Sequence, residues 1–369
     1  MRLSSADVFD FSIDLSLYRR KESSFLKGNH LKKKKVNATE IARLAGVSQS
    51  TVSRVFNSSK PVSEDLRRRV MDIAEMLEYR PNALARGLTM NKTNMIGLVM
   101  GDVENPFFSG ILEKMTSALK KRGFKILFVH TKEGLIQEEE ISQFMEYNVD
   151  GVIVTDALLT SNIVRQLSNN EIPVVLFYRD TKESSCHFVG CDNYSAGRKI
   201  GEFLYNQGHR QLAYITGHKD SSTNQERQEG FCTFLREKGI TPIIEAGGYS
   251  YKSGYRAALR LFSKNNRLDA IFCADDIMAI GVIDAAQSLG INIPKDLSIV
   301  GFDDIPMASW SPYSLTTWKV PVDEMIELTI SILLKEINEE TEEMEDTKHI
   351  LLPGTFIERK SVISNLKSL

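Results

Sequence analysis

The sequence has no long apolar run and only four cysteines among its 369 residues. No uninterrupted apolar stretch approaches the roughly 20 residues of a membrane-spanning helix, and the N-terminus lacks the positive stretch and apolar core of a signal peptide. We therefore expect a cytoplasmic protein. The cysteines show no tight pairing, which fits a reducing compartment and a packing role rather than a metal site. They are Cys186, Cys191, Cys232 and Cys273.

The common motifs of catalysis are also missing. The sequence contains no G-x-S-x-G nucleophile elbow, no P-loop and no metal-binding triad of recognised spacing. Two acidic pairs occur, Asp275-Asp276 and Asp303-Asp304. Neighbouring residues of a strand point to opposite faces, so each pair would present only one carboxylate to a shared centre. We expect no catalytic residue, no metal and no cofactor, and hence no enzyme.

Charge is distributed unevenly along the chain. The formal net charge is −2, yet residues 31–92 carry +7 and residues 93–369 carry −10. This division is expected where only a small basic part touches a polyphosphate, because the large acidic part is repelled from a nucleic-acid duplex. The charge pattern therefore favours nucleic acid as a partner.

The basic segment contains two short helical patterns separated by a glycine, in the run NATEIARLAGVSQSTVSRVFN at residues 37–57. Asn37 can cap the first helix, with Glu40 three residues later as in a capping box. Gly46 can end that helix in the left-handed conformation, and Ser48 is placed to cap the second helix. The spacing predicts a compact helix-turn-helix.

The second helix of this pair has an apolar inner face and a polar outer face. Its outward residues are Gln49, Ser50, Ser53 and Arg54. Side chains of this length can reach base edges in the major groove. An ordinary helical hairpin with a solvated polar face would have the same periodicity, so the pattern alone leaves that alternative open.

A third helix is predicted after Pro61 and Ser63. Its apolar stripe has helical spacing and would close a three-helix core; the stripe consists of Leu66, Val70, Ile73, Ala74 and Leu77. The residues Arg67 to Arg69 are expected to point mostly outward. Four adjacent lysines, Lys32–Lys35, precede the first helix and are placed either for phosphate contact or as a solvated tail.

The string IARLAGVSQSTVSRVFN resembles the DNA-binding motif of the lactose/galactose repressor family (LacI/GalR), in which AGVS-x-x-TVSRV-x-N is close to a signature. The resemblance covers about residues 36–360. It implies a homodimer, with a tetramer not excluded, that binds a palindromic operator in double-stranded DNA and a small-molecule effector. The implied DNA-binding residues are Thr39, Ser48, Gln49, Ser50, Thr51, Ser53, Arg54, Asn57, Asn82, Ala85, Arg86 and Leu88.

Residues 79–88 are similar to the family's hinge, which becomes helical when two subunits meet on DNA. Asn82 would cap this helix, and Leu88 would be the apolar wedge in the minor groove, unless it packs against the body of the protein. One or two helical turns are marginal alone because nucleation is unfavourable, so DNA and the partner subunit would have to order them.

Residues 1–30 show no convincing periodicity and precede the region of resemblance. Two alternatives stay open: a flexible extension, or translation that truly begins near Leu31. The predicted domains are a disordered N-terminal extension (1–35), a helix-turn-helix domain (36–80), a hinge (81–93), an effector-binding and dimerisation domain (94–360) and a C-terminal tail (361–369).

From Met95 onward, short apolar runs alternate with amphipathic helical patterns, as in parallel βα units. Strands are predicted at residues 96–100, 125–130, 151–155, 174–178, 212–216, 270–274 and 298–301. Helices are predicted near residues 107–122, 137–147, 194–207, 226–238, 252–264, 277–289 and 323–338. With late crossings at 317–321 and 349–357, the resemblance implies an α/β two-lobed, periplasmic-binding-protein-like (type I) domain after the small all-α domain.

Ligands of open parallel sheets bind at the carboxyl ends of the strands. Several segments at such positions resemble family motifs, namely NPFF (105–108), RQEGF (227–231), ADDIMA (274–279) and GFDD (301–304). The effector residues implied in this way are Asn105, Phe107, Tyr178, Arg227, Asp275 and Asp303. Alternatively, Phe107 belongs to the core at a helix start, and Asp303 caps the following turn.

Two of these positions depart from the family's pattern. Asp275 stands where asparagine is commoner, and Tyr178 stands where several sugar-responsive relatives carry an acid. A carboxylate at Asp275 still accepts hydrogen bonds from hydroxyls but repels anions, which favours a neutral polyol or sugar. We expect a sugar or a sugar derivative, with sugar phosphates also considered.

The function expected from these features is a repressor of carbohydrate-related genes under effector control. The alternative is a cytoplasmic solute-binding protein that uses the same two-lobed body without operating on DNA, and an enzyme that uses the cleft ranks third. Residues 37–57 separate these classes, because a solute binder needs neither a reading helix nor a basic segment.

Overall fold

A computed structural model describes residues 36–56, 61–80, 92–131, 136–157, 161–180, 186–264, 267–338 and 347–365. These residues fall into two compact units, a helical unit up to residue 80 and an α/β unit from residue 92 onward. Several predictions concern residues outside these ranges, namely the extension with Lys32–Lys35, the hinge, and the DNA-binding candidates Asn57, Asn82, Ala85, Arg86 and Leu88.

The helical unit consists of α2 (Ala38–Ala45), α3 (Gln49–Val55) and α4 (Glu64–Met76). Its core is formed by apolar residues at helical spacing, as predicted: Ile41, Ala42, Ala45, Val52, Val55, Val70, Ile73 and Ala74 are buried together. Leu66 and Leu77 pack against this cluster while partly exposed. The predicted three-helix core is confirmed.

The ends of α2 and α3 are determined by local hydrogen bonds and one left-handed residue. The Asn37 side chain accepts from the backbone N–H of Glu40 at 3.0 Å, and the Ser48 hydroxyl accepts from that of Thr51 at 3.2 Å. Gly46 ends α2 with φ 64°, where a residue with a Cβ is disfavoured. Both caps and the glycine turn were predicted from the sequence.

One arginine of α4 has a structural contact that the sequence did not indicate. Arg68 and Arg69 are exposed, as expected, but Arg67 is half-buried. Its Nη1 donates to the carbonyl oxygen of Val55 at 2.8 Å. Because the last carbonyls of a helix have no intrahelical partner, this bond ties α4 to the end of α3.

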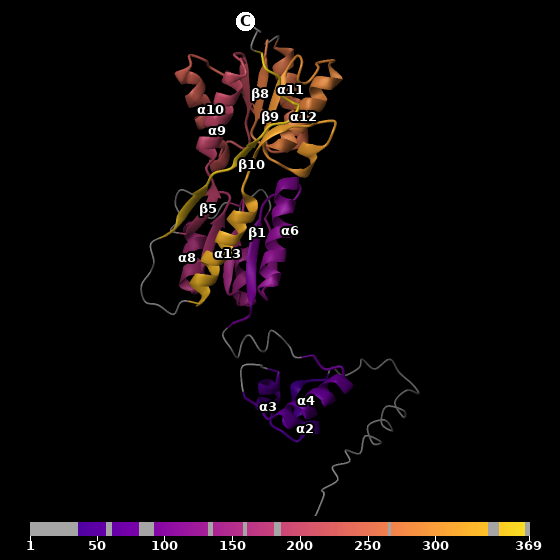
Figure 1. The fold of residues 1–369 in the computed structure, drawn as a ribbon. Coiled ribbons are helices and arrows are strands. Elements are labelled where there is room, and N and C mark those ends of the chain that lie inside the picture. Colours follow the sequence, from indigo (N-terminus) through magenta and orange to yellow (C-terminus); the bar gives the residue numbers. More distant parts are fainter. Residues whose placement is uncertain are drawn as a thin grey trace, which may run out of the picture. The chain divides into compact units, whose positions relative to one another are not determined.

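The α/β unit contains two six-stranded sheets (Figure 1). The first sheet has the order β11-β5-β4-β3-β1-β2, with β1 (Met95–Met100), β2 (Lys125–His130), β3 (Gly151–Val154), β4 (Val174–Phe177), β5 (His187–Cys191) and β11 (His349–Leu352). Every pairing in it is parallel. Together with α6 (Pro106–Lys121), α7 (Glu138–Glu146), α8 (Ser161–Asn169) and α13 (Val322–Asn338), this sheet forms what we call the first lobe.

The second sheet has the order β12-β10-β9-β8-β6-β7. Its strands are β6 (Leu212–Ile215), β7 (Ile243–Glu245), β8 (Ala270–Cys273), β9 (Ser298–Asp303), β10 (Thr316–Lys319) and β12 (Thr355–Ile357), and only the β10–β12 pair is antiparallel. With α9 (Asn193–Asn206), α10 (Ser222–Glu237), α11 (Tyr251–Ser263), α12 (Asp276–Ser288) and the 3₁₀ helix η2 (Pro306–Ser309), it forms the second lobe. Helices cover both faces, which is why central strands such as β8 are buried along their whole length.

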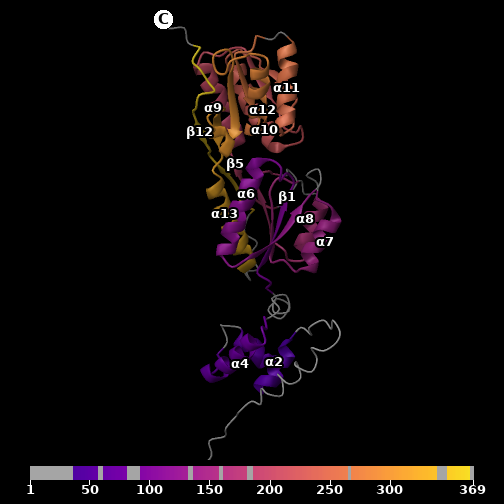
Figure 2. The same cartoon turned by 90° about the vertical axis from the view of Figure 1, so that its right-hand side faces the viewer.

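The chain passes between the lobes three times (Figure 2). The first passage leads from β5 to α9, the second from β10 to α13, and the third from β11 to β12. The second and third were predicted, at residues 317–321 and 349–357. The first was not predicted, because β5 was not recognised as a strand.

Several elements of the α/β unit were not predicted as such: β10, β11 and β12 lie in the segments expected only as crossings, η2 was not expected, and β5, β7 and α8 were missed altogether. Strand β5 contains a histidine and a glycine among its five residues, and β7 has only three residues at a sheet edge. Both are too short and mixed to show a strand pattern. Helix α8 did carry a signal, since Ile163, Val164 and Leu167 recur at helical spacing and are buried.

Two further sequence expectations concern the cysteines and membrane-spanning segments. Cys186, Cys191 and Cys273 are buried and Cys232 is half-buried, all as free thiols, which fits the packing role assigned to them. None of the helices that the structure describes combines the length and the apolar character needed to span a lipid bilayer.

Candidate nucleic-acid interface and effector site

The outer face of α3 presents a row of polar side chains. Gln49, Ser50, Ser53 and Arg54 are exposed, as is Ser48 before the helix, and Thr51 is half-buried. Val52 and Val55, on the opposite face, are each 1% exposed. The helix is thus anchored through its apolar side, and the predicted DNA-reading residues face solvent.

Hydroxyl groups at the start of α3 are held in a small network. The Ser48 hydroxyl lies 2.8 Å from the hydroxyls of both Ser50 and Thr51. Arg54 extends from the last turn of α3, and Thr39 is exposed in the first turn of α2. Such donors and acceptors on a rigid helix are suited to contacts with base edges and phosphates.

All six predicted effector residues belong to one connected cluster in the α/β unit. Three come from the first lobe: Asn105 caps α6, Phe107 lies in its first turn, and Tyr178 follows β4. Three come from the second lobe: Arg227 lies in α10, Asp275 caps α12, and Asp303 ends β9. All six are buried, and hydrogen bonds join the two lobes through them.

Arg227 is the centre of this cluster and is fully buried. Its Nη2 donates to the Tyr178 hydroxyl at 2.7 Å, and its Nη1 donates to the carbonyl oxygen of Ala274 at 2.6 Å. Its Nε donates to Asn193 Oδ1 at 2.8 Å, and its guanidinium lies 3.5 Å from the centre of the Phe302 ring. The arginine was expected to offer its donors to a ligand, but here protein groups use them.

Asn105 and Asp275 form a direct bond between the lobes. The Asn105 amide donates to Asp275 Oδ2 at 3.1 Å. The other oxygen of each side chain caps a helix, since Asn105 Oδ1 accepts from Phe107 N and Asp275 Oδ1 accepts from Met278 N. Burial raises the pKa of Asp275 to about 6, against the opposing effects of the Met278 N–H, Arg227 and Asn105.

Tyr178 and Asp303 form the second bond between the lobes. The Tyr178 hydroxyl donates to Asp303 Oδ1 at 3.1 Å, and Asp303 lies 4.0 Å from Arg227. Burial raises the pKa of Asp303 well above its usual range, although Arg227 acts in the opposite direction. Tyr178 has φ 72° and Asp303 has φ 112°, both in the left-handed region that non-glycine residues rarely adopt. Backbone strain of this kind gathers at functional sites.

Phe107 is 6% exposed and packs against two rings of the first lobe. Its ring centre lies 4.9 Å from that of Tyr178 and 5.3 Å from that of Phe108. This burial is what the alternative role at a helix start predicts. The contact with Tyr178 nevertheless places the ring directly beside the polar cluster.

Two residues near the cluster were not predicted. Asn193 accepts the Nε–H of Arg227, and its amide donates to Glu226 Oε2 at 3.2 Å. Tyr249 has φ 55°, and its hydroxyl lies 3.2 Å from that of Ser221. Asn193 comes two residues after β5, and Tyr249 lies between β7 and α11. Because neither β5 nor β7 was predicted from the sequence, no predicted strand end indicated these two residues.

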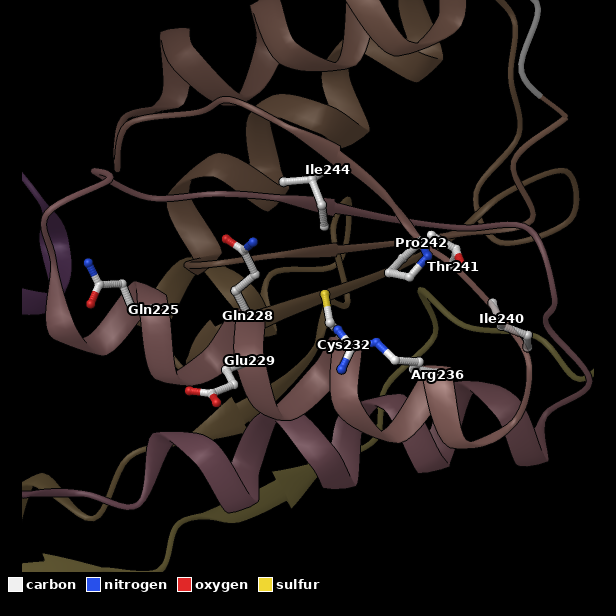
Figure 3. Close-up of a pocket in the computed structure, with 9 residues that line it drawn as sticks. All are labelled: Gln225, Gln228, Glu229, Cys232, Arg236, Ile240, Thr241, Pro242 and Ile244. Atoms are coloured by element: carbon white, nitrogen blue, oxygen red, sulfur yellow. The ribbon is translucent and has the colours of Figure 1, made fainter.

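A separate surface cavity of about 430 Å³ lies between α10 and β7 (Figure 3). None of the six predicted effector residues lines it. Its walls are formed by Gln225, Gln228, Glu229, Cys232, Arg236, Ile240, Thr241, Pro242 and Ile244. Arg227 lies on the buried side of the same helix, so this cavity and the polar cluster are on different faces of α10.

Comparisons with family models identify both units. A model described as bacterial regulatory proteins of the lacI family matches residues 38–82, and a periplasmic binding protein-like domain model matches residues 202–362. These matches cover the helix-turn-helix and much of the second lobe.

Relatives match over most of their length. The HTH-type transcriptional repressor PurR of Edwardsiella ictaluri is 30% identical over 329 residues, covering 88% of this chain and 96% of that protein. The repressor of the same name from Pectobacterium carotovorum is 32% identical over the same length, with the same coverage.

Solved structures share the fold. The Lac repressor dimer bound to operator and the anti-inducer ONPF has a TM-score of 0.79 at 24% identity, covering 89% of this chain and 100% of that one. The transcriptional regulator CelR in complex with cellobiose has a TM-score of 0.65 at 27% identity, covering 88% and 99%. A LacI family regulator from Enterococcus faecium with bound ribose has a TM-score of 0.66 at 26% identity, covering 73% and 99%.

The family models and the relatives indicate the same family as the sequence motif. The helix-turn-helix and the two-lobed body are consistent with this family. The chain belongs to the lacI family of bacterial regulatory proteins, and it is a transcriptional regulator with a DNA-binding helix-turn-helix and a periplasmic-binding-protein-like domain.

Proposed function

We propose that this regulator is a homodimeric repressor that reads a palindromic operator through the outer face of α3. The observation that carries the proposal is the exposed row from Gln49 to Arg54 on a helix whose opposite face is buried. The names of the relatives support repression. The Lac repressor structure, a dimer on operator DNA, supports the assembly, and two-fold symmetry explains why the operator would be palindromic.

The effector is proposed to bind between the lobes, at the cluster that contains Arg227, Tyr178 and Asp303. A ligand there would exchange hydrogen bonds with the groups that now join the lobes, namely Tyr178 with Asp303 and Asn105 with Asp275. If the lobes can adopt two arrangements, the ligand can shift the equilibrium between them only by the difference between its binding free energies for the two. Donors and acceptors from both lobes make such a difference possible.

A neutral sugar is the proposed ligand class. Arg227, the arginine of the cluster, already donates from all three of its nitrogen atoms to protein acceptors and lies 4.0 Å from Asp303, so the site offers an anion little unopposed positive charge. Carboxylates also accept hydrogen bonds from sugar hydroxyls. The cellobiose and ribose complexes of family members support this class, and sugar phosphates rank behind neutral sugars.

The DNA half of the proposal is tested by selecting bound sequences from random duplex DNA with the purified full chain. We expect enrichment of one palindrome whose half-sites lie about one helical turn apart. Selection of a single unrepeated site would contradict the dimer, and a pool without any enriched sequence would contradict operator reading.

The effector half is tested by titration calorimetry against neutral sugars, sugar phosphates, nucleobases and amino acids. We expect tight binding within the neutral sugars, with cellobiose and D-ribose as first probes. Tight binding of a nucleobase or an amino acid, with all sugars silent, would overturn the carbohydrate assignment while leaving the operator result unaffected.

A further inference from the structure

Asp276 is a buried acid that plays no part in the cluster described above. It is the first residue of α12 and is 0% exposed. Its Oδ1 accepts from the Thr317 hydroxyl at 2.6 Å, and its Oδ2 accepts from the backbone N–H of Ile305 at 2.9 Å. One carboxyl group thus holds three segments that are far apart in the chain.

The space for this carboxyl group depends on a glycine in the neighbouring strand. Gly301 in β9 is the register partner of Thr317 in β10. A Cβ built on Gly301 would lie 2.1 Å from Asp276 Oδ1, a distance that non-bonded atoms do not tolerate. The start of α12 therefore fits against the β9–β10 pair only because residue 301 has no side chain.

Both segments that Asp276 holds are connected to the proposed effector response. Ile305 lies two residues after Asp303, the last residue of β9, so its N–H belongs to the segment that directly follows Asp303, which we call the Asp303 turn. Thr317 lies in β10, from which the chain leaves the second lobe for α13 in the first. A displacement of the Asp303 turn is therefore mechanically linked to the strand that leads out of the lobe.

We propose that Asp276 is a positioning residue of the effector site, which fixes the Asp303 turn to β10 and so transmits a shift of Asp303 to the passage between the lobes. Its part in the effector response rests on the proposed function above. The link from α12 to the Asp303 turn and to β10 rests on the two hydrogen bonds of Asp276 and on the absence of a side chain at Gly301.

The electrostatics of Asp276 agree with a structural tie rather than with ligand binding. Burial raises its pKa to about 8, and the nearby carboxylates of Asp275 and Asp304 act in the same direction, against the hydrogen bonds from Thr317 and Ile305. The group therefore keeps its proton at neutral pH. A neutral carboxyl can be buried without a counter-ion.

The test is a double-mutant cycle that needs neither operator nor effector. Thr317→Val removes the hydroxyl bonded to Asp276, and Tyr178→Phe removes the hydroxyl bonded to Asp303. The background is full-length Trp310→Phe, which leaves Trp318, a buried residue of β10, as the only tryptophan of the chain. Thermal unfolding is then followed by Trp318 fluorescence, which reports on the α/β unit.

Thr329→Val is the matched control. Thr329 is as fully buried as Thr317, but its hydroxyl has no hydrogen-bond partner among the residues that the structure describes. If Asp276 positions Asp303, the melting-temperature changes of Thr317→Val and Tyr178→Phe should depart from additivity by about 2 °C or more. The same cycle with Thr329→Val should be additive, and so should the cycle with Thr317→Ser, which keeps the hydroxyl bonded to Asp276.

Hydrogen exchange provides a second measurement on the same variants. Thr317→Val should speed amide exchange at residues 303–305, although the substitution lies in β10, and Thr329→Val should leave that segment unchanged. Additive melting temperatures together with unchanged exchange at 303–305 would overturn the proposal. Because no ligand or operator is involved, this outcome is distinguishable from a failure of the operator selection or the sugar titration.

Discussion

At the scale of single residues, DNA reading and effector sensing depend on opposite kinds of environment. Arg54 is exposed on the face of α3 that we propose reads DNA. Arg227 is fully buried, and each of its nitrogen atoms donates to a protein acceptor. The same side-chain type is thus solvent-exposed at the proposed DNA-reading face and held by protein hydrogen bonds at the proposed effector site.

Replacing Arg54 by Ala is expected to weaken specific operator binding by about 1–3 kcal/mol, because donors to the DNA are lost. Folding should be nearly unchanged, since the side chain is exposed. Affinity for the selected operator is measured at matched salt. Arg256→Ala, at an exposed position of α11, is the control and should bind like the wild type. Equal affinities for Arg54→Ala and this control would refute the assignment.

Buried acids also predict how stability depends on pH. The pKa of Asp276 is about 8 and that of Asp275 about 6 in the folded chain, whereas an unfolded aspartate titrates near about 4. As pH rises from about 4 to about 8, the unfolded chain loses these protons first. Stability therefore falls through this window, at up to about 1.4 kcal/mol per pH unit for each group, and levels off above it.

Asp276→Asn should flatten this fall, because the amide has nearly the same shape, keeps one acceptor oxygen and does not titrate. Urea unfolding followed by Trp318 fluorescence at about pH 5 and about pH 8 gives the comparison. The variant should lose less stability than the wild type between the two conditions. Identical losses would mean that Asp276 does not hold its proton in the folded chain.

At the scale of elements, the caps and the turn of the helix-turn-helix follow from short-range chemistry. Gly46 takes φ 64°, and a Cβ added there would meet no atom within 4 Å. The cost of a side chain at this position is therefore conformational and not steric. Gly110, inside α6, has equally open surroundings without a positive φ.

The two glycines consequently predict opposite effects of the same substitution. Gly46→Ala should destabilise the helical unit by about 1 kcal/mol, because alanine is disfavoured in the left-handed region. Gly110→Ala should stabilise the α/β unit by up to about 1 kcal/mol, because alanine is a better helix former than glycine. Unfolding of each unit is measured by circular dichroism and by Trp318 fluorescence. A stabilising Gly46→Ala would contradict the turn described here.

At the scale of the whole molecule, the proposed effector site and the proposed DNA-reading face lie in different units, so we expect that mutation can separate the two functions. Asp303 lies in the α/β unit, and the reading row lies in the helical unit. The effector can change operator affinity only through its preference for one arrangement of the lobes. Removing a carboxylate that contributes to this preference should weaken the response without touching the reading face.

Asp303→Ala should therefore keep the operator affinity measured without effector but require at least about tenfold more effector to change it, as the loss of a charged hydrogen bond of about 1.5–3 kcal/mol implies. Titration of the operator complex with the sugar found by calorimetry provides the measurement. A lowered melting temperature together with weakened operator binding would show instead that Asp303 serves the local turn.

The sequence alone determined the parts of this protein that depend on local chemistry. Asn37, Gly46 and Ser48 specify the ends of two short helices, because capping and left-handed turns involve residues only a few positions apart. Continuous apolar runs likewise predicted β1 and β8 to within one residue at each end, because strands covered on both faces need apolar side chains throughout. The motif resemblance then placed six candidate effector residues.

Only the tertiary structure decided how those candidates relate to one another. The bonds between Asn105 and Asp275 and between Tyr178 and Asp303 join residues 170 and 125 positions apart. Three other features also depend on residues that are distant in the sequence. They are the passage from β5 to α9, the hydrogen bond from Arg67 to Val55, and the space beside Gly301 that Asp276 occupies. Such contacts depend on which segments the packed sheets bring together, and no periodicity within a single segment records its neighbours in space.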